Sequence, residues 1–252
     1  MLGGLQRSLD QDPLRAESAV RSRGEAEALT ARFSLVHRSV GPHGPRLSEI
    51  FAEKRLIATR PCTPREAGCG IDRVVYFFLG CGAYPEGAVA FLANAAVLRV
   101  KTATFTPFDT GSLEKYARPR DDAWAWEAAD KDAFLRGHLG FGPAALSFSS
   151  EYLAAHFKVP SDYVCRPQTS EPDFPAYHGL VNRVGDRRAW SIEVQLHGDL
   201  VLDRQSLAAI VLAQPDLLAD VPDDLVEKVV VAEDEGSITP VIHRLIIGEQ
   251  GS

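Results

Sequence analysis

The sequence predicts an α+β domain built on a mainly antiparallel β-sheet with flanking helices. Segments with helical spacing cluster in the first two thirds of the chain, whereas strand-like segments gather in the last third. This order differs from the regular βαβ alternation that is typical of parallel sheets. The sequence has no GxGxxG or GxxxxGKS/T phosphate loop, which argues against a Rossmann or P-loop domain.

The chain has 252 residues, a length that favours one domain with decorations. Its beginning is rich in Arg, Glu, Ala, Gln and Ser, and Asp12–Arg32 fits a polar helix with Pro13 in its first turn. The apolar stripe of this stretch is weak. We therefore expect a loosely docked helical arm over residues 1–31, dispensable for the chemistry, and a compact domain over residues 32–252.

The first half of the compact domain alternates apolar segments with Gly- and Pro-rich turns. Helical spacing of Leu47, Ile50 and Phe51 predicts an amphipathic helix, and a run of small residues predicts a second one. Short apolar runs with β-branched and aromatic residues predict the strands. In chain order, the expected elements are a strand at Phe33–His37, a helix at Leu47–Leu56, a strand at Val74–Leu79, a helix at Ala88–Ala95 and a strand at Val97–Thr106.

The second half opens on the least regular region, Asp109–Asp173, and then returns to strands. The same spacing criteria apply. In chain order, we expect helices at Ser112–Tyr116, Ala123–Leu139 and Ser150–Phe157, strands at Trp190–Leu196 and Leu207–Leu212, a short acidic helix or turn at Asp220–Glu227, and strands at Lys228–Ala232 and Val241–Ile247.

Composition narrows the function classes. The formal net charge of −7 argues against a protein that coats nucleic acid through clustered Lys and Arg. No apolar run approaches the roughly 20 residues that span a bilayer, and the N-terminus has no signal-peptide core. The 4 cysteines, without a CxxC pair, fit free thiols in a reducing cytoplasm better than a disulfide framework or a metal site. We expect a cytoplasmic protein without a metal and without a membrane partner.

The segment Trp190–His197, WSIEVQLH, carries the strongest functional signal. Strand alternation places Ser191, Glu193, Gln195 and His197 on one face and the apolar residues on the other. A carboxylate in mid-strand has poor β-propensity, and burying it without a partner is costly. Glu193 therefore either faces water or has a function.

Two earlier strand-like segments add His37 and Tyr76. Taken alone, His37 is typical of a hydrogen-bonded structural histidine at the end of a strand. Tyr76, taken alone, is typical of an aromatic residue in the core. Together with Glu193 they form a His strand, a Tyr strand and a late Glu strand, in that order.

This order resembles bacterial ADP-ribosyltransferases of the His–Tyr–Glu type. The segments SLVHRS, RVVYFFLG and SIEVQLHGDLVLD resemble the three motif strands, and the likeness covers roughly Arg32 to Leu212. The most similar group is that of the DarT-like and related toxin or phage-defence transferases. The resemblance implies a split antiparallel sheet of the ADP-ribosyltransferase type, NAD as substrate, a macromolecular acceptor and, for a toxin, a neutralising antitoxin.

The resemblance also assigns roles. Glu193 would stabilise the positive charge that develops when the nicotinamide–ribose bond breaks, His37 would hold a ribose hydroxyl, and Tyr76 would stack on the nicotinamide. Arg38, Tyr84 and Gln195 are further candidates for cofactor contacts, with Arg38 ranked lower because it points away from His37 on a strand.

Two departures from the family pattern bear on these roles. His43, in the loop GPHGP, competes with His37. Ser191 stands where many transferases of this fold carry an acceptor-recognising Gln or Glu, so protein, DNA and RNA all stay open as acceptors.

Three alternatives stay open beside the transferase. One is a catalytically inactive NAD- or partner-binding module of the same fold. Another is an RNA 2′-phosphotransferase-like enzyme, which should show a second pocket His and basic residues in place of Glu193. The least specific is an unrelated α+β structural protein.

Overall fold

The computed structural model describes residues 34–39, 47–59, 66–67, 71–80, 87–106, 140–141 and 192–247. The strands are β1 (Ser34–Ser39), β2 (Arg55–Leu56), β3 (Val74–Leu79), β4 (Val89–Asn94), β5 (Ala103–Thr106), β6 (Gly140–Phe141), β7 (Glu193–His197), β8 (Leu200–Val201), β9 (Leu207–Leu212) and β10 (Val229–Val231). The helices are α3 (Leu47–Glu53) and α10 (Ile238–Ile247), with 3-10 turns η1 (Ala95–Arg99), η4 (Pro215–Asp220), η5 (Asp223–Lys228) and η6 (Glu235–Ser237).

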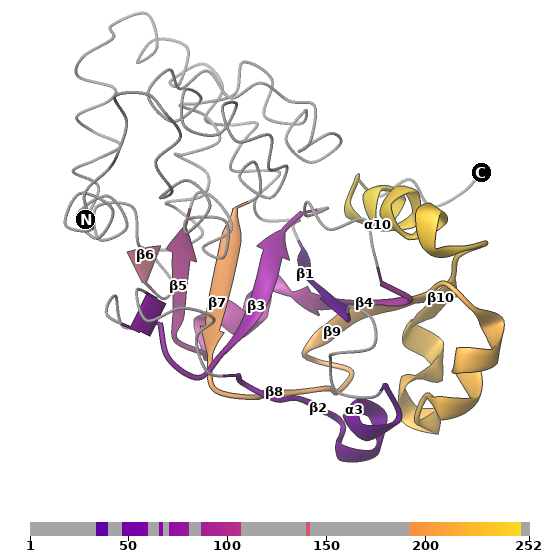
Figure 1. Ribbon diagram of the computed structural model, residues 1–252, viewed down its shortest axis with the longest axis horizontal. Helices are drawn as coiled ribbons and strands as arrows, with labels where there is room; N and C mark the ends of the chain where they lie inside the picture. The colour runs from indigo at the N-terminus through magenta and orange to yellow at the C-terminus, as the bar shows by residue number, and fades with distance from the viewer. Residues whose placement is uncertain are drawn as a thin grey trace, which may run out of the picture.

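Eight of these strands form one sheet in the order β10-β9-β4-β1-β3-β7-β5-β6, and β2 and β8 form a small second sheet (Figure 1). All neighbours in the large sheet are antiparallel except β9 and β10, which are parallel. The predicted α+β class with a mainly antiparallel sheet is confirmed. The strands predicted at Val74–Leu79 and Leu207–Leu212 have the expected bounds.

The centre of the sheet is made by β1, β3 and β7, which are neighbours although they lie far apart in the sequence. All three are strongly apolar on at least one face, so their side chains are removed from water when the sheet is covered. The two strand segments predicted at Phe33–His37 and Trp190–Leu196 correspond to β1 and β7, shifted toward the C-terminus by one to three residues.

The helix predicted at Ala88–Ala95 is wrong, because Val89–Asn94 form strand β4. This strand lies between β1 and β9, and five of its six side chains are buried. A strand that is covered on both faces has no alternation of polar and apolar residues, so its sequence resembles that of a buried helix. Pairing with two neighbours overrides the helix propensity of its alanines.

The strand predicted at Val241–Ile247 is also wrong, because these residues belong to helix α10. Its buried residues Ile238, Val241, Ile242 and Ile246 follow helical spacing. Asp234 accepts hydrogen bonds from Ser237 N and Ser237 Oγ, at 2.7 and 2.8 Å, and so caps the turn that leads into the helix.

Two further boundaries differ from the prediction. Helix α3 ends at Glu53 and not at Leu56, since Lys54 adopts a left-handed conformation (φ 48°) and the chain continues as β2. Only the last four residues of the strand predicted at Val97–Thr106 are extended, as β5, because η1 occupies Ala95–Arg99.

The sheet is covered on both sides. Phe51 of α3 packs edge-on against Phe91 of β4, with ring centroids 5.7 Å apart. Figure 1 shows α10 on the side of the sheet opposite to α3. Most buried apolar residues, from both faces, belong to one core that includes β1, β4, β9 and α10. A smaller apolar group, Ile71 and Val74 with Tyr76 against them, lies apart from that core.

Several predicted features lie outside the described residues. They are the arm over residues 1–31, the helices between Ser112 and Leu139, the helix Ser150–Phe157 and the four cysteines. Within the described part of the chain, no helix is both long and apolar enough to cross a membrane.

Candidate functional site

The strand register divides the central side chains between two faces, because residues directly opposite each other on paired strands point to the same side. Glu193 lies opposite Phe78, and Gln195 lies opposite Tyr76. Thr104 of β5 lies opposite Gln195 on its other flank. We call this side of the sheet, which carries Glu193, Gln195, Tyr76 and Thr104, the Glu193 face.

His37 lies on the other side of the sheet, which corrects the expectation that it converges with Glu193. Val36 is opposite Phe78, which is itself opposite Glu193, so Val36 belongs to the Glu193 face. His37 is the next residue along the strand and therefore points the opposite way. A His37 ring on that side cannot hold the same ribose as Glu193.

His37 is half-buried, and its ring lies beside two aromatic rings. Its ring packs against Phe77 and Phe91, with centroid distances of 5.7 and 6.4 Å, and its Nδ1–H donates to the Tyr76 carbonyl at 2.8 Å. Burial lowers the pKa of His37, and the hydrogen bond to Tyr76 opposes this shift. The neutral imidazole is therefore the form that the folded protein stabilises.

This burial predicts a pH effect. Because the pKa of His37 is lowered by folding, the unfolded chain takes up a proton near pH 6.5 more readily than the folded chain does. The neutral His37 therefore contributes fully to the free energy of unfolding above about pH 6.5, and this contribution is lost as the pH falls. His37→Gln keeps an N–H donor for the Tyr76 carbonyl but cannot titrate. Urea unfolding at pH 7.5 and 5.5 should show a smaller loss of stability in this variant than in the unaltered protein. An identical loss in both proteins would contradict the assignment.

Glu193 and Gln195 form a buried pair on the Glu193 face. Glu193 is 3% exposed and Gln195 is fully buried. Gln195 Nε2 donates to Glu193 Oε1 at 2.5 Å, although the two residues are two apart on one strand. Such a charge-assisted hydrogen bond fixes the rotation of the carboxylate. Glu193 therefore does not face water, and its carboxylate is buried with Gln195 as a hydrogen-bond donor.

Tyr76 is half-buried and lies beside this pair on the neighbouring strand. Its hydroxyl donates to Glu66 Oε1 at 3.3 Å. Glu66 is 1% exposed, so a second carboxylate is buried on this face. Sequence analysis did not find Glu66, since it lies in a Pro- and Gly-containing segment whose pattern gives no strand or helix parity.

No protein-family model matches this chain, and no curated protein is significantly similar to it in sequence.

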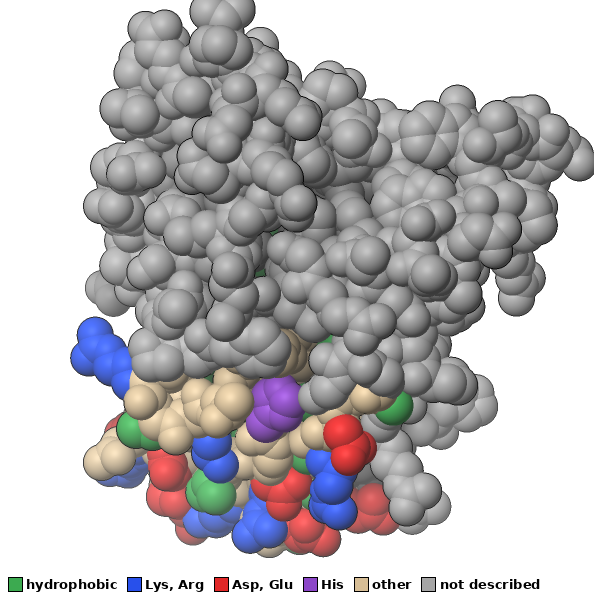
Figure 2. Space-filling view, turned by 90° about the vertical axis from the view of Figure 1, so that its left-hand side faces the viewer, with side chains coloured by type: hydrophobic (Ala, Val, Ile, Leu, Met, Phe, Trp, Pro, Cys, Tyr) green, Lys and Arg blue, Asp and Glu red, His purple; other side chains and the backbone are tan. Residues whose placement is uncertain are grey.

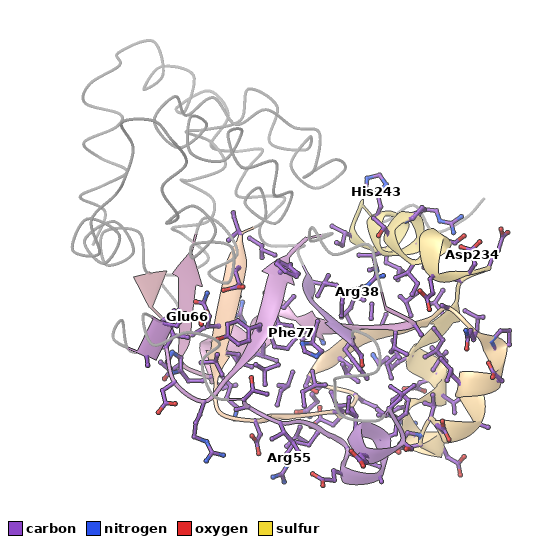
Figure 3. All side chains as sticks on the ribbon, in the orientation of Figure 1. Arg38, Arg55, Glu66, Phe77, Asp234 and His243 are labelled. Carbon is purple, nitrogen blue, oxygen red and sulfur yellow. The ribbon has the colours of Figure 1, made fainter. Side chains whose placement is uncertain are left out.

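Arg38 has the strand parity of Val36 and so belongs to the Glu193 face. Its side chain is buried, and Nη2 donates to the Gly87 carbonyl at 3.3 Å. Burial lowers the pKa of Arg38 to about 10, while the charge of Glu235 opposes the shift, so the guanidinium stays cationic at neutral pH. In Figure 3, Arg38 lies toward α10 and Glu66 lies near β7.

His197 continues the Glu193 face toward the far end of β7. Its Nε2 lies 3.4 Å from Thr104 Oγ1. Burial lowers the pKa of His197, and the charge of Asp72 opposes this. The predicted alternation of acid, amide and imidazole along this strand is therefore present from Glu193 to His197.

Two candidates lie outside the described residues: Tyr84, expected near the nicotinamide, and Ser191, before Glu193. His43, the rival of His37, lies outside them as well. Among the described residues, no three His, Cys, Asp or Glu side chains are grouped so that they could hold a metal ion.

Proposed function

We propose that this chain is an NAD-dependent mono-ADP-ribosyltransferase that acts from the Glu193 face. The observation that carries the proposal is the adjacency of β1, β3 and β7: three segments that resemble the motif strands of one family are consecutive in the sheet. Tyr76, Gln195 and Glu193 share one face of these strands. A chance likeness of three short segments would not require the three strands to be adjacent.

The charges on this face are arranged along the sheet. Carboxylates lie at the β7 side, in Glu193 and Glu66, and the cationic Arg38 lies two strands away on β1. A dinucleotide has a corresponding polarity, with a cationic nicotinamide at one end and a diphosphate further along. Glu193 suits the nicotinamide–ribose end, and the Arg38 guanidinium suits the diphosphate.

In the proposed reaction, the bond between nicotinamide and the ribose carbon breaks, and nicotinamide leaves with the bonding electron pair. The Glu193 carboxylate stabilises the positive charge left on the ribose. An acceptor oxygen or nitrogen forms the new bond to that carbon and loses its proton, for which a carboxylate is a suitable base. Gln195 keeps the carboxylate in one orientation, and Tyr76 offers a ring face to the nicotinamide.

The proposed acceptor is a macromolecule, as in the family that the chain resembles. Figure 2 shows Lys and Arg side chains interleaved with Asp and Glu over the described part of one face of the molecule. Such a mixed surface does not favour nucleic acid over protein by long-range attraction.

The test is incubation of the purified protein with NAD labelled in its adenylate part, in the presence of cell lysate. We expect free nicotinamide to appear and the label to become macromolecular. Nuclease and protease digestion of separate samples then shows which fraction carries the label. Absence of both nicotinamide release and label transfer would reject the proposal.

A catalytically inactive NAD-binding module is the second candidate, and the position of His37 favours it. The residue expected to hold the ribose lies behind the sheet, against Phe77 and Phe91. Saturable NAD binding, measured by calorimetry, without release of nicotinamide would show that the chain is such a binding module and not a transferase.

A further inference from the structure

Glu66 is a buried acidic residue that neither the sequence pattern nor the roles proposed above require. It lies in the short described segment 66–67, and Ile71 N donates to its backbone carbonyl at 3.0 Å. Its side-chain Oε1 accepts from the hydroxyl of Tyr76. Figure 3 shows Glu66 at the β7 side of the large sheet.

A carboxylate at this place is costly for the fold. Removing a charged group from water carries a desolvation penalty that its new contacts must offset. Apolar neighbours are already present, since Ile71 and Val74 are buried and pack with Tyr76. A leucine at position 66 would extend this apolar group without the desolvation cost. The carboxylate therefore stabilises something other than the packing.

One contact of the carboxylate is at the phenol end of Tyr76. A hydrogen bond at the far end of a tyrosine ring restricts rotation about the Cα–Cβ bond, because that rotation would move the hydroxyl oxygen away from its acceptor. On the neighbouring strand, Gln195 lies directly opposite Tyr76 and in turn holds Glu193. Across this face, the four side chains therefore follow one another in the order carboxylate, phenol, amide and carboxylate.

We propose that Glu66 is a positioning residue of the nicotinamide site, which fixes the Tyr76 ring before NAD binds. The inference rests on the proposed function, because it takes NAD as the ligand of the Glu193 face. Ordering the ring in the free protein removes an entropy cost from the binding step, so NAD affinity depends on Glu66 even though the carboxylate acts through Tyr76.

The test compares Glu66→Leu with the unaltered full-length chain. Glu66→Leu leaves the Tyr76 hydroxyl without this acceptor, so thermal stability is measured beside binding, and NAD affinity is compared between folded proteins. The Kd for NAD, measured by calorimetry, should rise about tenfold, the equivalent of roughly 1.4 kcal/mol. A residue with a merely structural role would change stability when replaced and leave the Kd for NAD of the folded protein unchanged.

Glu66→Gln keeps an oxygen acceptor for the Tyr76 hydroxyl, so its Kd should lie between those of the Leu variant and the unaltered protein. In the Tyr76→Phe background, which lacks the hydroxyl, Glu66→Gln should cause no further change in Kd. The exposed Glu53→Gln is the matched control and should bind NAD normally.

The outcomes separate the two proposals. If the unaltered protein binds no NAD, the proposed function fails, and the Glu66 inference fails with it. If the unaltered protein binds NAD and both Glu66 variants bind it equally well, only the Glu66 inference is overturned. Additive effects of Glu66→Gln and Tyr76→Phe would also overturn it. Should Glu66→Leu fold poorly, the near-isosteric Glu66→Gln decides alone.

Discussion

Glu193→Gln is expected to lower nicotinamide release and ADP-ribose transfer by roughly 10²–10³, the usual effect of removing one preorganised electrostatic stabiliser. The carboxylate is buried and held by Gln195, so its charge acts in a setting from which water is excluded. A glutamine has the same shape and can still present an oxygen to Gln195 Nε2. The fold and the Kd for NAD should therefore change by a few-fold at most.

The measurement is single-turnover release of nicotinamide at saturating NAD, together with calorimetric binding. Glu233→Gln, a change at an exposed acidic residue, is the matched control and should keep full turnover. Equal losses of affinity and turnover would mean that Glu193 only binds substrate and has no special role in the transition state. Unchanged turnover would exclude Glu193 from the chemistry.

Phe91→Ala is expected to destabilise the protein by about 3–5 kcal/mol, the range typical of removing a buried aromatic side chain. Phe91 is fully buried in β4, and its ring contacts both Phe51 of α3 and His37 of β1. The substitution leaves a cavity between the sheet and the helix, because two rigid aromatic rings cannot collapse into the space.

Urea unfolding followed by circular dichroism measures the loss in free energy of unfolding. Thermal unfolding measures the melting temperature, which should fall by roughly 10 °C in a chain of this length. Val100→Ala, at a side chain that is 82% exposed, serves as control and should unfold as the unaltered protein does. A loss below about 1 kcal/mol for Phe91→Ala would show that the contact between α3 and the sheet does not hold the core together.

Fold class followed from the sequence because it depends on the number and order of apolar segments. Val74–Leu79 and Leu207–Leu212 are apolar runs bounded by turns, and both are strands with the expected limits. The two errors of element type, β4 and α10, have different causes. Strand β4 is buried on both faces, and periodicity distinguishes helix from strand only where one side is polar. The buried residues of α10 do follow helical spacing, but the predicted segment started at Val241 and left out the first turn of the helix.

The site was only partly predictable, for a different reason. Alternation within β7 correctly grouped Glu193, Gln195 and His197. The same alternation correctly separated His37 from Arg38. It does not say which of these two shares a face with Glu193, because that depends on the register between strands, and a slip of one residue exchanges the faces. The family likeness selected His37, whereas the register selects Arg38. Glu66 was beyond sequence reasoning, since residues 66–67 are helical at a place where the Pro- and Gly-containing pattern predicts a loop.

The position of β7 has a consequence for the synthesis of the chain. This five-residue strand fits between β3 and β5, whereas in the sequence it follows the end of β5 at Thr106 by many residues. At translation rates of about 5–20 residues per second, roughly ten seconds separate the emergence of the two neighbours from that of the strand between them. During that time the facing edges of β3 and β5 lack their partner, and such edges invite pairing with other chains. Because Glu193 is the first residue of the inserted strand, a nascent chain gains this carboxylate only with the segment that joins β3 to β5.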